Sequence, residues 1–294
     1  WTTSGEYQRV LTSVSGCDSI VTTNLSVEPI PAPTEELQTQ SIQLEKGWNV
    51  FSSYIHPKNA SMDSVMESLI NSGDLVIVKD EVPNTYEQVS LKSTATGWIN
   101  NIGNLQKTEG YKIQVESSCL FEITGTPVSL PISIEIKQGV NLISFPINGS
   151  VDAMQVIQPL IDANLINKVQ DERGNSIEMW RNMGWINGIG NFHAGEGYVI
   201  DAKHDGILTI NEGTEKSGVF VTERPEPDYF KVCYVGNGLD HMNINVVELN
   251  ATNFRAGDEI AAFDGEVCVG VVKLTESDLI NDAVSIPVSA SEPD

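Results

Sequence analysis

The sequence predicts a mainly β protein with α+β modules: a β-strand tail, two tandem α+β repeats with one helix each, and a β-sandwich-like domain. Three observations favour this class. Apolar and polar residues alternate with period two over many short stretches. A unit of roughly 88 residues occurs twice, which indicates a tandem duplication. Turn-forming groups such as Gly236-Asn237-Gly238 and Asp264-Gly265 separate strand-like stretches in the last part of the chain.

The charge of the chain limits its partners. The 294 residues include 17 Lys and Arg but 40 Asp and Glu, which gives a net charge of −23. Proteins that bind nucleic acids need basic patches to neutralise phosphates, so we expect no nucleic-acid partner. An anionic membrane surface repels the same field, and aliphatic stretches such as residues 75–78 are too short to cross a bilayer. We therefore also expect no membrane insertion.

The first part of the chain predicts a strand pair and a linker. Residues 1–28 alternate between polar and apolar, often β-branched, side chains, which is typical of strands. An isolated pair of strands is only marginally stable in water, so we expect further chain to cover it. Residues 29–40 contain Pro29, Pro31 and Pro33 among polar residues and predict an extended linker.

The strongest internal pattern is a repeated motif. Residues 97–113 and 184–200 are identical at 11 of 17 positions, at a constant shift of 87. Three upstream matches, with shifts of 92, 89 and 91, begin at Gly47 and Gly139, Ser61 and Ser150, and Val78 and Val169. A drifting shift places small length differences in loops, where they cost little. We predict that the units at 41–127 and 128–213 share one fold and superpose.

Each unit contains one stretch with helical periodicity. Apolar residues recur at i, i+3 and i+4 over residues 65–70 and 154–161, after Ser and Asp residues suited to cap a helix. Strands are predicted around each helix. They cover residues 48–55, 75–79, 110–115 and 120–124 in the first unit, and 140–147, 166–170, 197–201 and 207–210 in the second.

The last part of the chain predicts a separate domain. A polar stretch at 214–227 predicts a second linker, and residues 228–294 predict a β-sandwich-like domain. Its predicted strands cover residues 229–235, 242–249, 259–263 and 267–274. Because a sandwich usually contains more strands, we interpret this domain as incomplete. We expect its last strand, residues 284–288, to lie at or near an open sheet edge.

The four cysteines offer one candidate disulfide. No Cys-x-x-Cys pair occurs among Cys17, Cys119, Cys233 and Cys268, which argues against a zinc ribbon or a thioredoxin-like site. Only Cys233 and Cys268 fall in one predicted domain, so they are the disulfide candidate. Buried free thiols are an equally compatible interpretation.

Motifs of catalysis are missing from the sequence. The histidines His56, His193, His204 and His241 show no metal-ligand spacing, and the sequence contains no HExxH, G-x-S-x-G, P-loop or G-x-G-x-x-G motif. We therefore predict that the chain is not an enzyme.

The repeated Gly-Trp-Ile-Asn-x-Ile-Gly-Asn motif has two interpretations. As a sugar platform, Trp98 or Trp185 would stack on a pyranose while Asn100 or Asn187 binds hydroxyl groups. As a hairpin motif, Trp and Ile would fill the core, and the Gly and Asn pairs at 103–104 and 190–191 would take positive φ angles in a turn. Duplication favours the hairpin, because residues that determine the fold must persist in both copies.

Acidic residues suggest one calcium hypothesis. Asp258 and Asp264 flank a short predicted strand and could ligate Ca²⁺ from the adjoining loops. The pairs Asp80-Glu81 and Asp171-Glu172 are interpreted instead as turn-forming, solubilising acids. We expect no other cofactor.

The residues also resemble a known group of proteins. Residues 3–27, including Ser15-Gly16-Cys17, resemble the end of a repeat common in large exported surface proteins of Bacteroidota. That repeat usually has an earlier cysteine paired with the one at Cys17, so the resemblance implies no partner for Cys17 within residues 1–294. Residues 41–213 and 229–274 resemble two further modules of the same proteins. The matching segments are Gly47-Trp48-Asn49, Leu75 to Glu81, Gly110-Tyr111, Ile123-Thr124-Gly125 and Gly257 to Gly270; the second copy departs at Val140 and Asn211.

The resemblance implies a location and a role. Such proteins are similar to type IX secretion cargo, which is held at the outer-membrane surface of a Gram-negative bacterium or released. Their modules are accessory, so no catalytic residues carry over. We expect a non-catalytic structural or adhesive segment whose partners are other domains of the same polypeptide, glycans or surface proteins. The alternative is a carbohydrate-binding accessory region of an extracellular hydrolase, which exposed rings of Trp98 and Trp185 on one face would favour.

Overall fold

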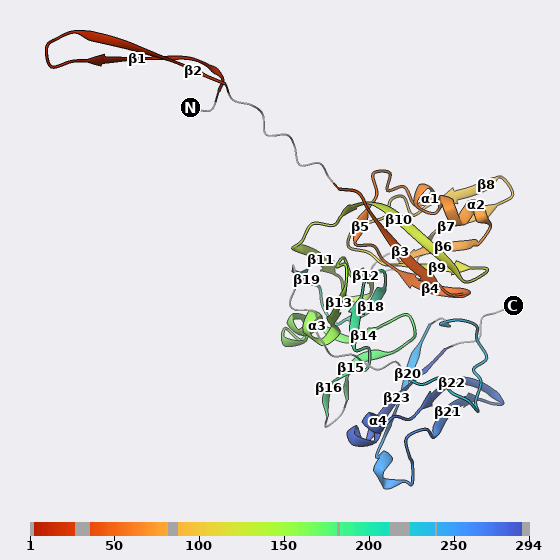
Figure 1. Ribbon diagram of the computed structural model, residues 1–294. Helices are drawn as coiled ribbons and strands as arrows, with labels where there is room; N and C mark the ends of the chain where they lie inside the picture. The colour runs from red at the N-terminus through yellow and green to blue at the C-terminus, as the bar shows by residue number, and fades with distance from the viewer. Residues whose placement is uncertain are drawn as a thin grey trace. The chain divides into compact units, whose positions relative to one another are not determined.

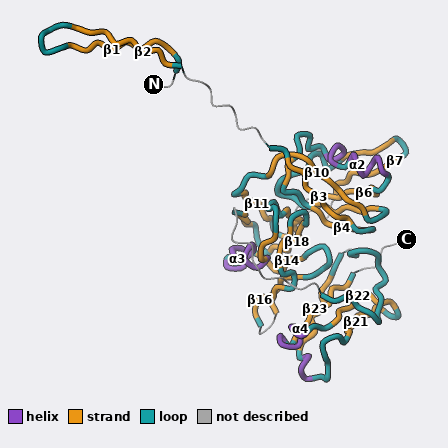
Figure 2. Tube along the Cα trace, viewed as in Figure 1, coloured by secondary structure: helices purple, strands orange, loops and turns teal. Residues whose placement is uncertain are grey.

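Strands dominate the computed structural model, which describes residues 3–26, 36–81, 88–180, 183–211, 224–238 and 240–289 (Figures 1 and 2). The predicted mainly β class with α+β modules is confirmed. The chain divides into two units, Trp1–Glu36 and Leu37–Asp294. Both repeats and the C-terminal domain belong to the second unit.

The first unit is a two-stranded antiparallel hairpin, as the alternation of residues predicts. It pairs β1 (Gly5–Thr12) with β2 (Asp18–Leu25) in register, and the backbone N–H of Ser13 donates to the carbonyl of Cys17 at 3.0 Å to close the turn. Most of its side chains are exposed, including Val10 at 56% and Ile20 at 65%. Most of the predicted linker lies outside the described residues, but its predicted end at residue 40 is wrong because a strand begins at Gln38.

The first repeat contains a five-stranded antiparallel sheet in the order β4-β9-β6-β7-β8. Its strands are β4 (Gly47–Phe51), β6 (Leu75–Glu81), β7 (Gln88–Thr94), β8 (Gly97–Asn100) and β9 (Tyr111–Val115). A separate sheet joins β3 (Gln38–Leu44), β10 (Cys119–Pro127) and β5 (Ile55–His56). Two short helices, α1 (Met62–Val65) and α2 (Glu67–Ser72), connect the sheets along the chain.

The second repeat has the same strand order, so the prediction that the repeats share a fold is confirmed. Its sheet runs β12-β18-β14-β15-β16, and β11 pairs with β19 as β3 pairs with β10. The elements are β11 (Ile132–Ile136), β12 (Gly139–Ser144), β13 (Ser150–Asp152), α3 (Ala153–Asp162), β14 (Ile166–Gln170), β15 (Ser176–Trp180), β16 (Gly184–Asn187), β17 (Asn191–His193), β18 (Gly197–Ala202) and β19 (Gly206–Ile210). Trp98 and Trp185 occupy equivalent positions: each is the second residue of the strand at the end of its sheet, β8 in the first repeat and β16 in the second.

Fine details of the backbone also recur. The register shifts between Leu75 and Ile77 in one copy and between Ile166 and Lys168 in the other, in the same strand pair. Such bulges are specific features of a strand pair rather than random irregularities. Their coincidence supports a single ancestral backbone for both copies.

The starts of the helices correct one sequence match. The N–H of Met62 donates to the Gly103 carbonyl at 2.8 Å, and the N–H of Ala153 donates to the Gly190 carbonyl at 2.9 Å. The residue before each helix is therefore Ser61 in one copy and Asp152 in the other, a shift of 91 rather than the predicted 89. Serine and aspartate are both common at this position. Matching serine with serine therefore paired Ser61 with the wrong residue of the second copy.

The predicted helices differ between copies. Helix α3 is continuous and the Asp152 carboxylate caps it, accepting the N–H of Gln155 at 2.9 Å. In the first repeat the helix is interrupted at Met66, and the Ser61 hydroxyl donates to the Asp63 carboxylate instead of capping the helix. The single helix predicted there is thus two short ones.

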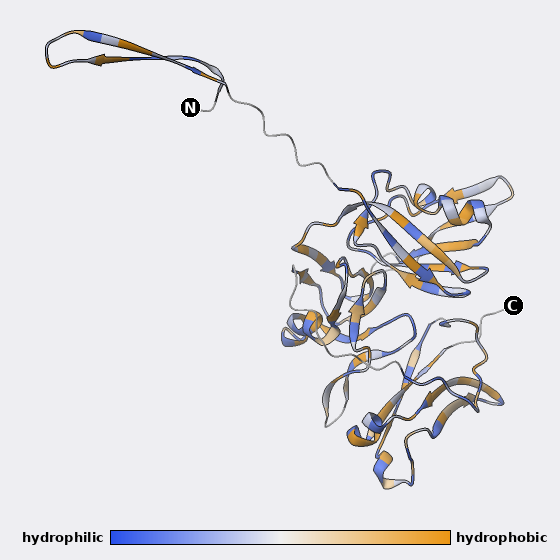
Figure 3. Cartoon of the chain, viewed as in Figure 1, coloured by the Kyte–Doolittle hydropathy of each residue, from blue (hydrophilic) through white to orange (hydrophobic). Residues whose placement is uncertain are grey.

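Each repeat has its own core between the helices, the five-stranded sheet and the β3–β10 or β11–β19 pair. In the first, Leu69, Val78, Ile113 and Phe121 are buried together from these three sources. Along β10 the side chains alternate between the core and solvent, and Figure 3 shows mixed hydropathy along the strands. The corresponding buried residues of the second repeat are Leu160, Val169, Ile200 and Leu208.

The two repeats contact each other through the same surface. Phe51 of the first repeat forms an antiparallel bridge with Glu196 of the second. Ile143, which matches Phe51, forms the same bridge with Glu109, which matches Glu196. Each contact thus occurs twice with the roles of the repeats exchanged, as in an isologous dimer.

Backbone hydrogen bonds follow the same local two-fold relation. The N–H of Ser52 donates to the Gly195 carbonyl at 2.8 Å, and the N–H of the matching Ser144 donates to the Thr108 carbonyl at 3.1 Å. These bonds satisfy backbone groups that would otherwise be buried without partners between the repeats.

Two glycines lie at the centre of this interface. A methyl group on Gly110 would lie 2.8 Å from the Ile143 carbonyl oxygen and 3.3 Å from the Cα of Gly197. A methyl group on Gly197 would lie 2.8 Å from Val50 Cγ1 and 3.4 Å from the Cα of Gly110. The Glu-Gly-Tyr segment therefore contains glycine in both copies because the two backbones approach too closely for any side chain.

The C-terminal domain contains two small antiparallel sheets around a third core. The sheets pair β20 (Met242–Val247) with β23 (Ala283–Val288), and β21 (Glu259–Asp264) with β22 (Val267–Lys273). A 3-10 turn, η1 (Leu249–Ala251), and a helix, α4 (Glu276–Asn281), complete it, and Leu249, Val272 and Ile286 are among its buried residues. As expected, β23 is an edge strand, because its sheet has only two strands in the described part of the chain.

The strand predicted at 229–235 is wrong. The backbone N–H groups of Asp228, Tyr229 and Phe230 donate to the Glu259 carboxylate, at 2.5, 3.1 and 3.0 Å. The Glu259 side chain thus accepts the hydrogen bonds that these N–H groups would donate to a neighbouring strand in a sheet. The helix α4 was not predicted, although Thr275 and Asp278 form a reciprocal capping box at its start.

We expect Gly110→Ala to destabilise the unit that contains the repeats, by about 1–3 kcal/mol, because the added methyl group overpacks a backbone contact. Thermal unfolding followed by circular dichroism measures the effect. Gly5→Ala is the control, since its methyl group would meet only Tyr7, at an ordinary distance of 3.7 Å. An unchanged unfolding temperature for Gly110→Ala would contradict the close packing described here.

Candidate functional site

Two matching groups of acidic and phenolic side chains lie beside the contact between the repeats. Asp80, Glu109 and Tyr111 form one, and Asp171, Glu196 and Tyr198 form the other, at equivalent positions. The glutamate and tyrosine flank the central glycine of the interface in each copy, so the local two-fold relation places both groups near the junction.

The tyrosines organise these groups. The Tyr111 hydroxyl accepts the N–H of Gln106 at 2.9 Å and donates to the Glu109 carboxylate at 3.1 Å. In the second repeat the Tyr198 hydroxyl accepts the N–H of His193 at 2.8 Å and donates to the Glu196 carboxylate. Burial, with the nearby glutamate second, raises the pKa of both phenols, so they stay protonated donors.

Three carboxyl groups here hold protons unusually well. Burial raises the pKa of Asp80 to about 7, with the Glu109 charge as the second cause. Burial likewise raises the pKa of Asp171 to about 6 and that of Glu172 to about 7, and Glu196 adds to both. Such groups can take up and release protons near neutral pH.

The pairs Asp80-Glu81 and Asp171-Glu172 were predicted to be turn-forming, solubilising acids, and this is wrong in part. Asp80 and Glu81 end strand β6 instead of forming a turn. Asp171 does form the turn between β14 and β15, since its carboxylate accepts the N–H groups of Arg173 at 3.0 Å and Asn175 at 2.8 Å. However, both Asp171 and Asp80 are partly buried rather than freely solvated. The local sequence predicts the turn at Asp171, but it does not show the burial, which depends on groups distant in the sequence.

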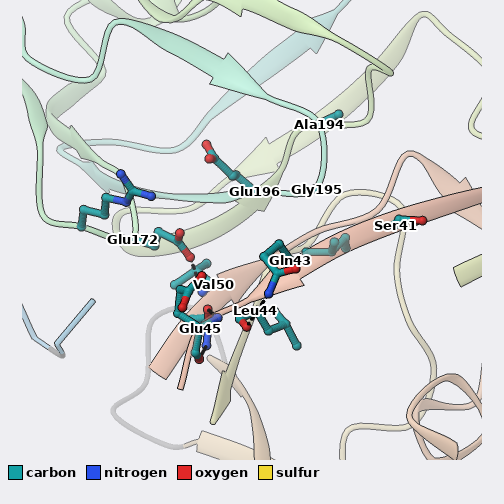
Figure 4. A pocket seen from close by; sticks show the side chains of 12 residues that line it. Ser41, Gln43, Leu44, Glu45, Val50, Glu172, Ala194, Gly195 and Glu196 are labelled. Carbon is teal, nitrogen blue, oxygen red and sulfur yellow. Dashed lines mark hydrogen bonds between the residues drawn. The ribbon is translucent and has the colours of Figure 1, made fainter. Parts of the chain in front are cut away.

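A polar pocket of about 270 Å³ lies at the junction, lined mainly by β3, β4 and the second repeat. Glu45, Glu172 and Glu196 contribute carboxyl groups to it, and Arg173 contributes the opposite charge. The Glu172 carboxylate accepts the N–H of Val50 at 3.1 Å, across the interface (Figure 4). The excess of acid favours cationic over anionic occupants.

The C-terminal domain binds the second repeat next to this pocket. The Asn243 side-chain carbonyl accepts from Lys168 at 2.6 Å and from Gln170 at 2.9 Å, and its amide donates to the Gly174 carbonyl at 2.8 Å. His241 Nε2 lies 2.9 Å from the Glu172 carbonyl oxygen. The turn between β14 and β15 therefore contacts the first repeat on one side and the C-terminal domain on the other.

The asparagines predicted to bind sugar are occupied by their own loops. The Asn100 side-chain carbonyl accepts the N–H groups of Ile102 and Gly103, and its amide donates to the Gly103 carbonyl at 2.9 Å. Asn187 makes the matching bonds to Ile189 and Gly190. Trp98 and Trp185 are half-buried and pack against the two cores.

The hairpin interpretation of the motif also needs one correction. Gly103 and Gly190 adopt positive φ angles of 90° and 84°, as predicted. Asn104 and Asn191 were predicted to do the same, but positive φ occurs at neither. Both instead pair with the chain segment before the helix, an extended role that positive φ would disrupt.

The predicted calcium ligands are not brought together. Asp258 precedes β21 and Asp264 ends it, so six extended residues, roughly 20 Å, separate the two ends. Asp258 instead accepts the N–H of Arg255 at 2.9 Å. Across the described ranges no cluster of three or more His, Cys, Asp or Glu is arranged to hold a metal ion.

All four cysteines are free thiols in the structure. The predicted disulfide partners are nevertheless neighbours, because the backbone N–H of Cys233 donates to the Cys268 carbonyl at 2.9 Å. Cys17 is exposed at the end of the β1–β2 turn, and Cys119 is half-buried at the start of β10. The Cys233–Cys268 disulfide remains a prediction.

Glu109 and Glu196 were not predicted as partners of the other acids. The available signal was the Glu-Gly-Tyr segment, identical in both copies at the same spacing. Its role depends on the folding of each repeat, which brings the glutamate near an aspartate 25–29 residues earlier in the chain.

Within the described residues, no helix is long and apolar enough to span a membrane. Comparisons with protein-family models, curated proteins and solved structures gave no match.

The raised pKa values predict how stability changes with pH. A carboxyl group whose pKa is near 7 when folded and about 4 when unfolded binds more protons in the folded state between these values. Stability is then highest near the lower value and falls as pH rises towards 7. We expect the unfolding temperature to be several degrees higher at pH 5 than at pH 8.

Asp80→Asn separates this effect from general charge repulsion. The amide mimics the protonated acid, so the variant should unfold at a higher temperature than the parent at pH 8 and near the parent's temperature at pH 5. Glu116→Gln, at an exposed position, removes the same charge without the burial. Equal pH profiles for the two variants would argue against a buried proton at Asp80.

Proposed function

We propose that the chain is a non-catalytic structural segment of a large secreted or surface-attached bacterial protein. In this role the two repeats and the C-terminal domain act as a spacer that holds neighbouring domains of the polypeptide apart. The resemblance of three modules to accessory units of type IX secretion cargo supports a place at the outer-membrane surface or outside the cell.

The observation that carries this proposal is that the residues shared by both repeats bind or pack against the chain's own backbone. The asparagines of the Gly-Trp-Ile-Asn motif bind loop backbone, and the tyrosines of the Glu-Gly-Tyr segment bind backbone N–H groups. The glycine of that segment permits the repeats to touch. Selection that retains these residues is therefore explained by folding and by joining the repeats.

Further support comes from the contacts between modules. The repeats are joined by paired backbone bonds, and Asn243 joins the second repeat to the C-terminal domain through three side-chain bonds. Many polar contacts of fixed geometry restrict relative motion. A spacer of defined length needs this property, whereas an adhesive tether of separate domains does not.

The carbohydrate-binding alternative would require the repeated Trp and Asn side chains to face a ligand. Both asparagine amides are engaged, and both tryptophan rings pack against cores. We therefore propose the structural role alone.

Asn100→Ala tests the structural role of the repeated motif. It leaves the N–H groups of Ile102 and Gly103 without their acceptor, so we expect a loss of about 1–3 kcal/mol in the free energy of unfolding, measured with urea. Asn104→Ala, at an exposed side chain in the same loop, is the matched control and should cost less than 0.5 kcal/mol, roughly the effect of a surface substitution.

The same variants, with Trp98→Ala and Trp185→Ala, should be applied to an immobilised glycan library. The proposal expects no glycan signal from the parent that depends on these residues. A specific signal that Asn100→Ala or Trp185→Ala removes without lowering stability would favour the carbohydrate-binding function instead.

A further inference from the structure

The segment before β20 connects the C-terminal domain to the first repeat. Its beginning is held by the Glu259 carboxylate and by an ion pair between Asp228 and Lys273. Its end reaches the first repeat, where a methyl group on Gly236 would clash with the Lys46 carbonyl and one on Gly47 would lie 3.2 Å from the Val235 carbonyl oxygen. The middle of the segment contains Cys233.

Cys233 lies directly beside Cys268 of β22. A backbone hydrogen bond of 2.9 Å joins the two residues. Since each Cα atom lies about 1.5 Å from its own nitrogen and about 2.4 Å from its own carbonyl oxygen, this bond holds the two Cα atoms at most about 6.8 Å apart. Disulfides join Cα atoms that are about 4.4–6.8 Å apart, so the bond can form without a large movement of the backbone.

The two thiols differ in their exposure to solvent. Cys268 is 8% exposed, and its thiol lies 3.6 Å from the Gly270 carbonyl oxygen, whereas Cys233 is exposed. Burial, followed by the side chains of Cys233 and Cys268, raises the pKa of the Tyr234 phenol, which is consistent with both sulfurs lying near one hydroxyl group. One thiol is thus accessible to an external reagent, and the other lies beside it.

We propose that Cys233 and Cys268 form a disulfide in an oxidising compartment and thereby fasten the segment that contacts the first repeat to β22. This inference goes beyond the spacer role and does not depend on it. The oxidant is a small-molecule disulfide such as oxidised glutathione.

The exchange proceeds in two balanced steps. The Cys233 thiolate attacks one sulfur of the small disulfide, forms a mixed disulfide and releases one small thiolate. The Cys268 thiolate then attacks the Cys233 sulfur and releases the second small thiolate. The two protons lost by the cysteines pass to the two released thiolates, and the pair of electrons given up by the cysteines reduces the small disulfide.

The bond would close a loop of about 36 residues and reduce the entropy of the unfolded chain. We therefore expect a higher unfolding temperature in the oxidised form. We also expect slower hydrogen exchange at the backbone of residues 233–236, because the segment can no longer separate from β22.

The experiment uses the full chain, folded, after incubation with reduced or oxidised glutathione. Free thiols are counted in denaturant, and non-reduced peptides are identified by mass spectrometry. We expect four thiols in the reduced sample, at least two fewer in the oxidised sample and a peptide linking Cys233 to Cys268. Four thiols after oxidation, or a link that involves another cysteine pair, would overturn the proposal.

Variants complete the test. Cys17→Ser and Cys119→Ser, alone or together, should retain the oxidation-dependent loss of two thiols and the rise in unfolding temperature. Cys233→Ser should abolish both while its unfolding temperature matches that of the reduced parent. If Cys233→Ser retains the temperature rise, the bond does not fasten this segment and the inference is wrong.

Discussion

The contact between Gly110 and Gly197 is the constraint on which the arrangement of the repeats depends. Two backbones can approach this closely only where neither residue has a side chain. The approach aligns the end of each first sheet strand with the opposite Glu-Gly-Tyr segment, so the paired bridges and backbone bonds form together. A single large side chain at this point would remove all of them at once.

The same constraint explains the acidic junction. Because a glutamate and a tyrosine flank each glycine, bringing the glycines together places both acidic groups beside the junction, where each aspartate lies near the glutamate of its own repeat. In a chain with a net charge of −23, this grouping costs free energy at neutral pH, since like charges repel in a partly dry environment. The hydrogen bonds from the tyrosines offset part of that cost by satisfying one carboxylate in each group.

The two repeats share a fold but differ in their neighbours. The turn between β14 and β15 of the second repeat contacts Val50 on one side and His241 and Asn243 on the other. This asymmetry arises because one C-terminal domain can dock on only one copy of a duplicated surface. The two related repeats and the C-terminal domain thereby form a series of modules with two different ends. Such a series suits a segment that connects one domain to the next.

The duplication and the positive φ angles at Gly103 and Gly190 follow from the sequence alone, because they depend on spacing along the chain and on local turn chemistry, whereas the strand order came from the structure. The burial of Asp80 and Asp171, the reason for glycine at 110 and the loss of the strand predicted at 229–235 emerge only from the folded chain. Each of these depends on a group distant in sequence, such as a facing backbone or the carboxylate of Glu109 or Glu259. Local patterns report which conformations a segment can adopt, whereas burial and pairing depend on which surfaces meet.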